Sequence, residues 1–251
     1  MEKTVKKIVA RPFHMASVEI IIPFHGEQAK VTSLIENIFQ TVHTNKYLVT
    51  LVDDCSVNKN FVKDIEKAKI AGVRCLRQER HNGFGAAVNL ALKTPFRVNP
   101  TYVCILQSDV TLHDAAWLSN LGHSLLSNNQ IGMISPLTDN PVIESPILTA
   151  KRDEKRKDSI LNEGYLPMYC VLANRNLFSQ VGLLSECPYA GIEAEEFASR
   201  MKKKGFQQGV CGTSWVHHQG RATLSRFDNN EKVQKELQDV KEDFEKFLAK
   251  A

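Results

Sequence analysis

Two spacings of apolar residues alternate along the first half of the chain. Short β-branched or apolar runs predict strands at 18–22, 48–52, 73–76 and 101–106. Between these runs, apolar residues recur every three or four positions, as on an amphipathic helix. The first such stripe contains Val31, Leu34, Ile35, Ile38, Phe39 and Val42. Further helices are predicted at about 60–71, 84–93 and 114–127. This alternation predicts an α/β fold with a mostly parallel central sheet flanked by helices.

The second half is less regular. It predicts a strand near 169–173, a helix at about 193–204 and a strand near 214–216. Residues 139–165 hold two prolines and a run of charged residues at 151–158, which we interpret as a solvated loop. The alternative is a flap over a substrate, because long loops in compact domains often serve as lids.

A last stripe of apolar residues marks the end of the chain, amid alternating Lys and Glu: Val233, Leu237, Val240, Phe244 and Leu248. This spacing predicts a C-terminal amphipathic helix over 228–251. The helix would dock on the body of the protein or on a partner, so a homodimer formed through it is one hypothesis. The stripe is too short to assert a coiled coil.

Composition narrows the class of protein. The 251 residues are 43% hydrophobic and 24% charged, which excludes a disordered or collagenous chain. The formal net charge of +4 is far below that of a dedicated nucleic-acid binder. The six cysteines show no C-x-x-C pair, and no window approaches the about 18 apolar residues of a membrane helix. We therefore expect reduced thiols and a cytoplasmic protein without a membrane span.

Acidic and polar clusters follow the predicted strands. They are Asp53-Asp54, Gln107-Ser108-Asp109 and, later, Glu193 to Glu196. Because the carboxyl ends of parallel strands share one edge of a sheet, we expect these clusters to converge. A carboxylate there can bind a hard divalent cation, accept hydrogen bonds from a base or ribose, or take a proton from a hydroxyl. The alternative for each cluster is an ordinary turn or helix cap.

A glycine-containing loop, His81-Asn82-Gly83-Phe84-Gly85, precedes one of the predicted helices. It lacks both G-x-G-x-x-G and the G-K-[ST] ending, so a dinucleotide-binding site is disfavoured. Gly83 and Gly85 would still let the backbone approach a ligand closely, with a helix N-terminus behind them.

These motifs, in this order, resemble the inverting glycosyltransferases of family 2, which have the GT-A fold. The resemblance covers residues 18–127 through four segments: Ile22-Pro23-Phe24-His25-Gly26, Val52-Asp53-Asp54-Cys55-Ser56, Asn82 to Leu90, and Leu106-Gln107-Ser108-Asp109-Val110. The second half is similar to the rhamnosyltransferase-like subgroup at Ala173-Asn174-Arg175, Val181-Gly182, Glu193 to Phe197, and Val216-His217-His218-Gln219-Gly220.

The resemblance implies a role for each matching residue. Asp54 would read the nucleobase by hydrogen bonding, and Asp53 would support it near the ribose. Asp109 would hold Mn²⁺ or Mg²⁺, and His217 would complete the metal or diphosphate site, with His218 the less favoured neighbour. The other residues implied for the nucleotide site are Pro23, His25, Asn82, Gly83, Asn89, Gln107 and Ser108.

The proposed base departs from the family pattern. The family places Glu-Asp at a helix start where this chain has Glu193-Ala194. We expect the general base to be Glu193, then Glu196, then Glu195. The alternative for all three is a favourable acidic first turn of a helix. Gln107 also departs from the acidic or Asn residue usual at the start of the metal motif.

The resemblance thus implies a metal-dependent hexosyl- or deoxyhexosyltransferase that moves a sugar, with inversion, from a UDP-, GDP- or dTDP-linked donor to a glycan or glycoprotein hydroxyl. The predicted parts are an arm at 1–17, a GT-A domain at 18–227 and the C-terminal helix. Residues 18–127 would bind the nucleotide and 128–227 the acceptor. The alternatives are a sugar-1-phosphate nucleotidyltransferase and a non-catalytic sugar-nucleotide or glycan-binding module, motivated by Ala194.

Overall fold

The computed structural model describes residues 18–41, 47–94, 96, 100–186, 192–220 and 242. The expected N-terminal arm lies outside these ranges, as does the expected C-terminal helix except for residue 242. Within the described part, no helix is both long enough and apolar enough to span a bilayer.

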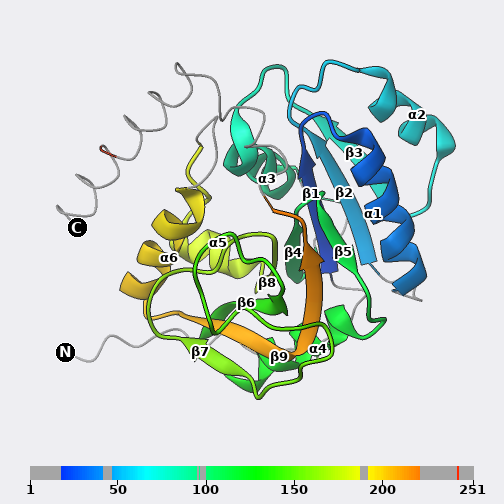
Figure 1. Cartoon of the computed structure of the whole chain (residues 1–251). Coiled ribbons are helices and arrows are strands. Elements are labelled where there is room, and N and C mark those ends of the chain that lie inside the picture. The colour runs from blue at the N-terminus through cyan, green and yellow to red at the C-terminus, as the bar shows by residue number, and fades with distance from the viewer. Residues whose placement is uncertain are drawn as a thin grey trace.

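The first half consists of the predicted β-α units, and its strands are parallel. The elements are β1 (Val18–Phe24), α1 (Gln28–Thr41), β2 (Tyr47–Asp53), α2 (Asn60–Ala68), β3 (Val73–Arg77), α3 (Gly83–Lys93) and β4 (Tyr102–Leu106). The strands lie side by side in the order β3-β2-β1-β4, as Figure 1 shows. Every strand and helix predicted here is confirmed, with ends shifted by a few residues.

The second half extends the same sheet with mixed pairing. Its elements are β5 (Val110–Leu112), α4 (Trp117–Ser127), β6 (Ile131–Thr138), β7 (Ser159–Leu161), β8 (Cys170–Asn174), α5 (Asn176–Val181), α6 (Glu193–Lys203) and β9 (Gln207–His218). The sheet order continues from β4 through β8, β6 and β9 to β5, with β7 also on β9. Only β6 and β9 are parallel here, so the expectation of a mostly parallel sheet holds for the first half alone.

The pattern did not predict β6 and predicted only residues near 214–216 of β9, because glycine and proline interrupt the apolar spacing of these strands. β6 contains Gly132 and Pro136, and β9 contains Gly209 and Gly212, which interrupt the apolar spacing. A Cβ on Gly212 would overlap the carbonyl of Arg156, because the charged loop crosses β9 there. The Arg156 N–H donates to the Gly212 carbonyl at 2.8 Å. The rest of the charge run at 151–158 is exposed, as expected for a solvated loop. The predicted loop at 139–165 also contains β7 and the buried Leu148 and Ala150.

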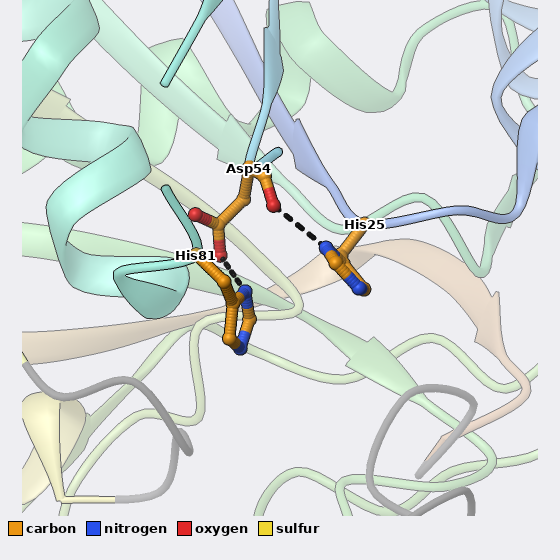
Figure 2. A group of neighbouring side chains, drawn as sticks. All are labelled: His25, Asp54 and His81. Carbon is orange, nitrogen blue, oxygen red and sulfur yellow. Dashed lines mark hydrogen bonds and ion pairs between the residues drawn. The ribbon is translucent and has the colours of Figure 1, made fainter. Parts of the chain in front are cut away.

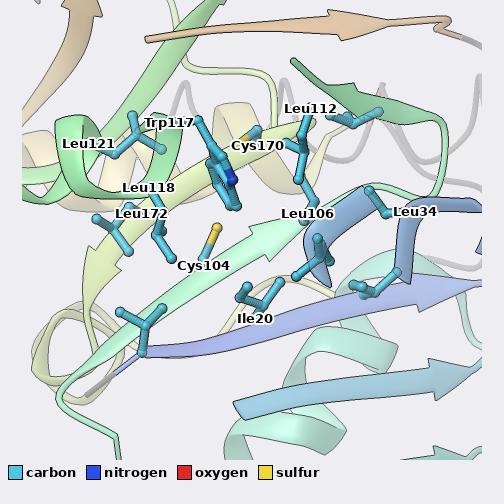
Figure 3. Close-up of a cluster of buried hydrophobic side chains, with 14 of the residues drawn as sticks. Ile20, Leu34, Cys104, Leu106, Leu112, Trp117, Leu118, Leu121, Cys170 and Leu172 are labelled. Atoms are coloured by element: carbon cyan, nitrogen blue, oxygen red, sulfur yellow. The ribbon is translucent and has the colours of Figure 1, made fainter. Parts of the chain in front are cut away.

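Helices cover both faces of the sheet because successive strand residues point in opposite directions. In β1, Ile20 and Ile22 face a cluster built with α1, α2 and α4, whereas Ile21 faces a second cluster built with α3, α5 and α6. Figure 3 shows the first cluster, in which the fully buried Trp117 packs near Cys104 and Cys170. The five described cysteines are free thiols, as expected; Cys187 lies outside the described residues.

A buried ion network joins the strands at the amino edge of the sheet. Glu19, with no exposed surface, accepts hydrogen bonds from Thr50 at 2.5 Å and Arg74 at 2.8 Å. Arg175 forms an ion pair with the other oxygen of Glu19. Two guanidinium groups therefore surround one carboxylate, at the end of the sheet opposite the predicted site.

Candidate active site

The end of β1 is fastened to the loop that follows β2. Pro23, the next-to-last residue of β1, is buried. The His25 ring nitrogen Nδ1 lies 2.6 Å from the carbonyl oxygen of Asp54. The Gly26 N–H donates to the Ser56 hydroxyl at 2.7 Å. Gly26 has φ 81°, a conformation that glycine adopts without steric cost. The two strand ends therefore form one surface at the carboxyl edge of the sheet.

Asp53 is turned into the protein. It has no exposed surface, and its Oδ1 accepts hydrogen bonds from the Ser56 N–H at 2.8 Å and the Ser56 hydroxyl at 2.5 Å. Its other oxygen forms an ion pair with Arg77, which also donates to the Ser56 carbonyl. This geometry does not support the expected position of Asp53 near a ribose. Asp53 instead shapes the turn that presents Asp54.

Asp54 caps the start of α3. Its Oδ1 accepts from Gln78 at 3.0 Å and from the Asn82 N–H at 2.9 Å. Its Oδ2 accepts from the Gly83 N–H at 2.9 Å and lies 2.7 Å from His81 Nδ1. Burial raises the pKa of this carboxyl, but the His81 contact and the two backbone N–H groups outweigh burial, and the net pKa is lowered.

This arrangement uses the full hydrogen-bond-accepting capacity of the Asp54 carboxylate. A carboxylate offers about four lone-pair sites, and Asp54 already has four donors. It is also only 4% exposed. A direct hydrogen bond from Asp54 to a nucleobase, as the sequence implied, would have to displace one of these donors. The geometry supports an ordering role for Asp54 at the loop Asn82–Gly83 that the sequence also placed at the nucleotide.

His25, Asp54 and His81 form the group in Figure 2, in which both rings lie on the same side of Asp54. One potential ligand atom from each residue lies within 4.8 Å of the others, so the group could hold a metal ion. The two rings are 4.5 Å apart between centroids. His81 was not among the predicted site residues, although its place between β3 and α3 is the signal that could have found it.

Asp109 forms the second acidic centre, just after β4. Its Oδ1 lies 3.4 Å from Nε2 of His218, and both side chains are nearly buried. The same Nε2 lies 3.1 Å from Oε1 of Gln107, while Nδ1 of His218 contacts the Asn140 carbonyl at 2.7 Å. Burial raises the pKa of Asp109, but hydrogen bonding and charge from His218 and the charge of Lys30 lower it below its usual value.

The histidine that contacts Asp109 is thus His218, and this geometry favours it over His217, the residue preferred from the sequence. His217 pairs instead with Asp139, with 2.6 Å between Nδ1 and Oδ2. The other Asp139 oxygen accepts from the His218 N–H at 3.2 Å. Adjacent residues on β9 point to opposite faces. His218 is the one whose ring contacts Asp109, while His217 and Asp109 both line one cavity. Asp139 itself was missed; its signal is its position directly after β6.

Asn89 lies away from any ligand surface. It is 1% exposed, and its side-chain amide donates to the Leu184 carbonyl at 2.8 Å while accepting from the Leu184 N–H at 3.0 Å. It also donates to Glu186 at 3.1 Å. These contacts do not support the implied nucleotide contact of Asn89. The residue fastens α3 to the segment before α6. Ser108, by contrast, lies beside Asp109 on the wall of a cavity.

The three candidate bases at the start of α6 have different surroundings. Glu196 binds Arg200 through both oxygens, at 2.5 and 2.6 Å, and accepts from the Ser185 hydroxyl at 2.6 Å. Glu193 is 3% exposed and packs at Gly85 in the first turn of α3, whereas Glu195 is exposed. Because the Glu196 carboxylate is fully engaged with a guanidinium, its expected role as a base is not supported.

Comparison with known proteins places this site in context. Residues 19–140 match the family model described as "Glycosyl transferase family 2". No match was found among curated protein sequences. Among solved structures, a mannosyltransferase from Pyrobaculum calidifontis in complex with GDP-Man and Mn²⁺ superposes with a TM-score of 0.63 at 15% identity. It matches 84% of this chain and 59% of its own.

Two further structures are similar. GalNAc-T7 with UDP, GalNAc and Mn²⁺ has a TM-score of 0.62 at 16% identity, covering 80% of this chain and 43% of its own. S. aureus TarS 1–349 has a TM-score of 0.61 at 14% identity, covering 81% of this chain and 60% of its own. The chain therefore spans less than two thirds of the length of these neighbours, and at these identities the likeness concerns the fold.

Proposed function

Because residues 19–140 form a glycosyltransferase family 2 region within a GT-A fold, we propose that the protein is a metal-dependent glycosyltransferase. It would transfer a sugar from a nucleoside diphosphate donor to an acceptor hydroxyl with inversion. The first half would bind the donor nucleotide and the second half the acceptor. The free thiols support a cytoplasmic location.

One observation carries the proposal. Three separate strands deliver functional groups to one edge of the sheet: β2 ends at Asp53, directly before Asp54, β4 ends just before Asp109, and β9 ends at His218. The two carboxyl groups both have lowered pKa values and are anionic at neutral pH. The carboxyl edge of an α/β sheet is where ligands bind in such folds. An anionic, partly enclosed edge of this kind suits a cation that binds a diphosphate.

The residues at Asp109 fit a divalent cation. The carboxylate oxygen, the imidazole of His218 and the amide oxygen of Gln107 lie together, and oxygen with imidazole suits Mn²⁺. When bound there, a divalent cation would stabilise the charge that develops on the leaving diphosphate. The Asp54 carboxylate is less available to a metal, because four hydrogen-bond donors already occupy it. We therefore assign the metal to Asp109 and His218, with Mn²⁺ or Mg²⁺ as the ion.

Protein groups would do the remaining work. Asp54 holds the Asn82–Gly83 backbone and the N-terminus of α3 at the nucleotide site, where a helix N-terminus favours an anion. Glu193 is the proposed base, since its neighbour Glu196 is neutralised by Arg200. In a single displacement, the base removes the acceptor proton as the hydroxyl attacks the anomeric carbon. The donor sugar is proposed to be a hexose or deoxyhexose and the acceptor a glycan or glycoprotein.

A non-catalytic sugar-nucleotide-binding module is the second candidate. It is favoured by the burial of Glu193, the ion pair of Glu196 and the alanine at position 194. Such a module would bind the nucleotide sugar and leave it intact. The two candidates share the donor site and differ only in turnover.

The deciding experiment combines donor binding with turnover. The protein is incubated with Mn²⁺ and UDP-, GDP- or dTDP-linked hexoses, and nucleoside diphosphate release is measured with and without glycan acceptors. An enzyme releases diphosphate faster when an acceptor is present, and EDTA abolishes this release. Binding by calorimetry without release supports the module. Absence of both binding and release contradicts both candidates.

The matched variants are Glu193→Gln and Glu195→Gln. Both remove one carboxylate from the first turn of α6, but only the first removes the proposed base. Loss of transfer in Glu193→Gln with unchanged donor binding supports the assignment. Equal activity of the two variants would exclude Glu193 as the base.

A further inference from the structure

The two residues that follow β6 hold the end of β9. Oδ1 of Asp139 accepts a hydrogen bond from the His218 N–H at 3.2 Å, and Oδ2 lies 2.6 Å from Nδ1 of His217. The side-chain Nδ2 of Asn140 donates to the Gln219 carbonyl at 3.0 Å. Because β6 and β9 are parallel neighbours, their last residues lie at the same edge of the sheet. We call this pair of residues the Asp139–Asn140 clamp.

A further contact of the clamp reaches the ring of His218. Nδ1 of this ring lies 2.7 Å from the backbone carbonyl oxygen of Asn140. A carbonyl oxygen can only accept, so Nδ1 carries the proton of this hydrogen bond. The ring is 2% exposed, and its other nitrogen, Nε2, lies 3.1 Å from Gln107 and 3.4 Å from Asp109. The Asn140 carbonyl is thus bonded to the ring edge opposite the carboxylate.

Stacking alone does not determine this orientation of the ring. Tyr169 stacks on His218 with 5.1 Å between ring centroids and 24° between the planes. This contact restricts the plane of the imidazole, but a half-turn about χ2 keeps the plane and exchanges the ring edges. In the flipped ring, carbon atoms would face both Asn140 and Asp109. The hydrogen bond to the Asn140 carbonyl therefore favours the orientation that places Nε2 toward Asp109.

The position of this carbonyl depends on the Asn140 side chain. Its Oδ1 accepts from the Val142 N–H at 3.0 Å, while its Nδ2 donates to Gln219. Val142 has φ 68°, a strained conformation for a β-branched residue. Such strain persists only where the surrounding structure over-determines it, and it clusters at functional sites. The Asn140 amide is the group that joins the strained turn to the end of β9.

Gly220 leaves the room that the Asn140 amide needs. It has φ 72°, and a Cβ at this position would lie 2.5 Å from Nδ2 of Asn140. A contact this short would push the amide away from its place beside the Gln219 carbonyl. A substitution at Gly220 therefore disturbs Asn140 without changing Asn140 itself.

We propose that Asn140 is a positioning residue that holds Nε2 of His218 toward Asp109 for the binding of the divalent cation. A histidine that ligates a metal almost always donates its other ring N–H to a carbonyl, a carboxylate or water, and loss of such a partner typically weakens metal affinity by about 10–100-fold. The inference rests on the proposed function, which assigns the cation to Asp109 and His218. It adds the residues that orient the histidine before the cation binds.

The first test uses the metal-free protein. The proton on Nδ1 of His218 is protected from exchange while Asn140 accepts it, so ¹H–¹⁵N NMR of the imidazole should show a resonance that His218→Ala removes. Asn140→Ala should lose this resonance through exchange with water. Asn128→Ala is the matched control, because Asn128 makes the same turn with the Gln130 N–H, at 2.9 Å, before β6 instead of after it. The resonance should be unchanged in the control.

The second test measures Mn²⁺ affinity by calorimetry, with circular dichroism to establish that each variant is folded. Asn140→Ala and Gly220→Ala should each raise the Kd by about tenfold or more, and Asn128→Ala should change it by less than about twofold. Gly164→Ala is the control for Gly220→Ala. Gly164 has φ 77°, but a Cβ there would meet no atom within 4 Å, so only the backbone strain is shared. The two site variants disturb Asn140 independently, so either one decides the question.

The outcomes separate this inference from the proposed function. An unchanged Nδ1 proton resonance and an unchanged Mn²⁺ affinity in the folded site variants would overturn the positioning role of Asn140. Equal losses of affinity in the site variants and their controls would also overturn it, because a general loss of stability would then explain them. If His218→Ala binds Mn²⁺ as tightly as the wild type, or the wild type binds none, the metal assignment of the proposed function fails. The NMR resonance then still decides whether Asn140 orients His218.

Discussion

The two edges of the central sheet both bury carboxylates, but they give them different partners. At the amino edge, Glu19 is surrounded by the guanidinium groups of Arg74 and Arg175. At the carboxyl edge, Asp54 and Asp109 contact histidines, and Asp54 also binds backbone N–H groups. A guanidinium is charged at every accessible pH, whereas imidazole can lose its proton or bind a metal.

The difference separates stability from function within one sheet. The partners at the amino edge make a permanent network that holds β1, β2, β3 and the start of α5 together. We expect the partners at the carboxyl edge to be exchanged for a ligand. Substitutions at the amino edge should therefore change stability without changing binding, and substitutions at the carboxyl edge should change binding.

The largest effect is expected at Glu19. Glu19→Gln leaves two guanidinium groups without their buried counter-charge, and breaking a buried pair in this way costs about 3–5 kcal/mol. We expect a loss of this size in the free energy of unfolding, measured by urea denaturation. Donor affinity per folded molecule should be unchanged. Glu154→Gln, which breaks an exposed pair with Arg156, is the control and should leave the free energy of unfolding nearly unchanged.

The second effect is expected at Asp109. Asp109→Ala should reduce Mn²⁺-dependent donor binding and transfer by about 100-fold or more, because even indirect support of a metal ligand is worth up to about that factor. His218→Ala should follow it, and His217→Ala should retain metal affinity. If His217→Ala abolishes Mn²⁺ binding and His218→Ala does not, the assignment of the histidines is reversed.

Asp54 is the residue at the carboxyl edge whose substitution is expected to change both stability and binding. Asp54→Asn places an NH₂ group against a backbone N–H of Asn82 or Gly83, and leaving such a donor unsatisfied costs about 1–3 kcal/mol. We expect this moderate loss of stability together with weakened nucleotide binding. Gln28→Ala, on the surface of α1, serves as the control. Weakened binding with no loss of stability would show that Asp54 contacts the nucleotide directly.

The smallest effect concerns the stability of the folded state at low pH. The folded-state pKa values of Asp54 and Asp109 lie below the ordinary value of 3.8. The unfolded chain therefore takes up protons first as the pH falls, so both groups stabilise the folded state above pH 3.8. This stabilisation is lost as the pH drops from there through the lowered folded pKa values. Urea titrations across this range should show a smaller loss in Asp54→Asn than in the wild type. Equal losses would contradict the lowered pKa of Asp54.

The sequence predicted that the candidate site lies at the carboxyl edge of the sheet, but not which residues the site residues contact. Strand ends at Asp54 and Asp109 follow from β-branched runs, and the convergence of parallel strand ends is a general property of such sheets. The choice between His217 and His218 depends on the register of β9 against β5, which the glycines of β9 conceal. The Glu196–Arg200 ion pair could have been predicted from the four-residue spacing of these residues on a helix. Asn89 with Leu184 joins residues far apart in the chain, which no local pattern specifies.

Gly85 has a consequence for how this chain and its relatives can diverge. A Cβ at this position would overlap the carbonyl of Ser185 and would lie 3.2 Å from Cγ of Glu193. Gly85 belongs to the family-matched region, whereas Ser185 and Glu193 lie beyond residue 140. The two halves are therefore not interchangeable modules. A chimera that joins this N-terminal half to the C-terminal half of a distant relative has to preserve the close approach at this glycine.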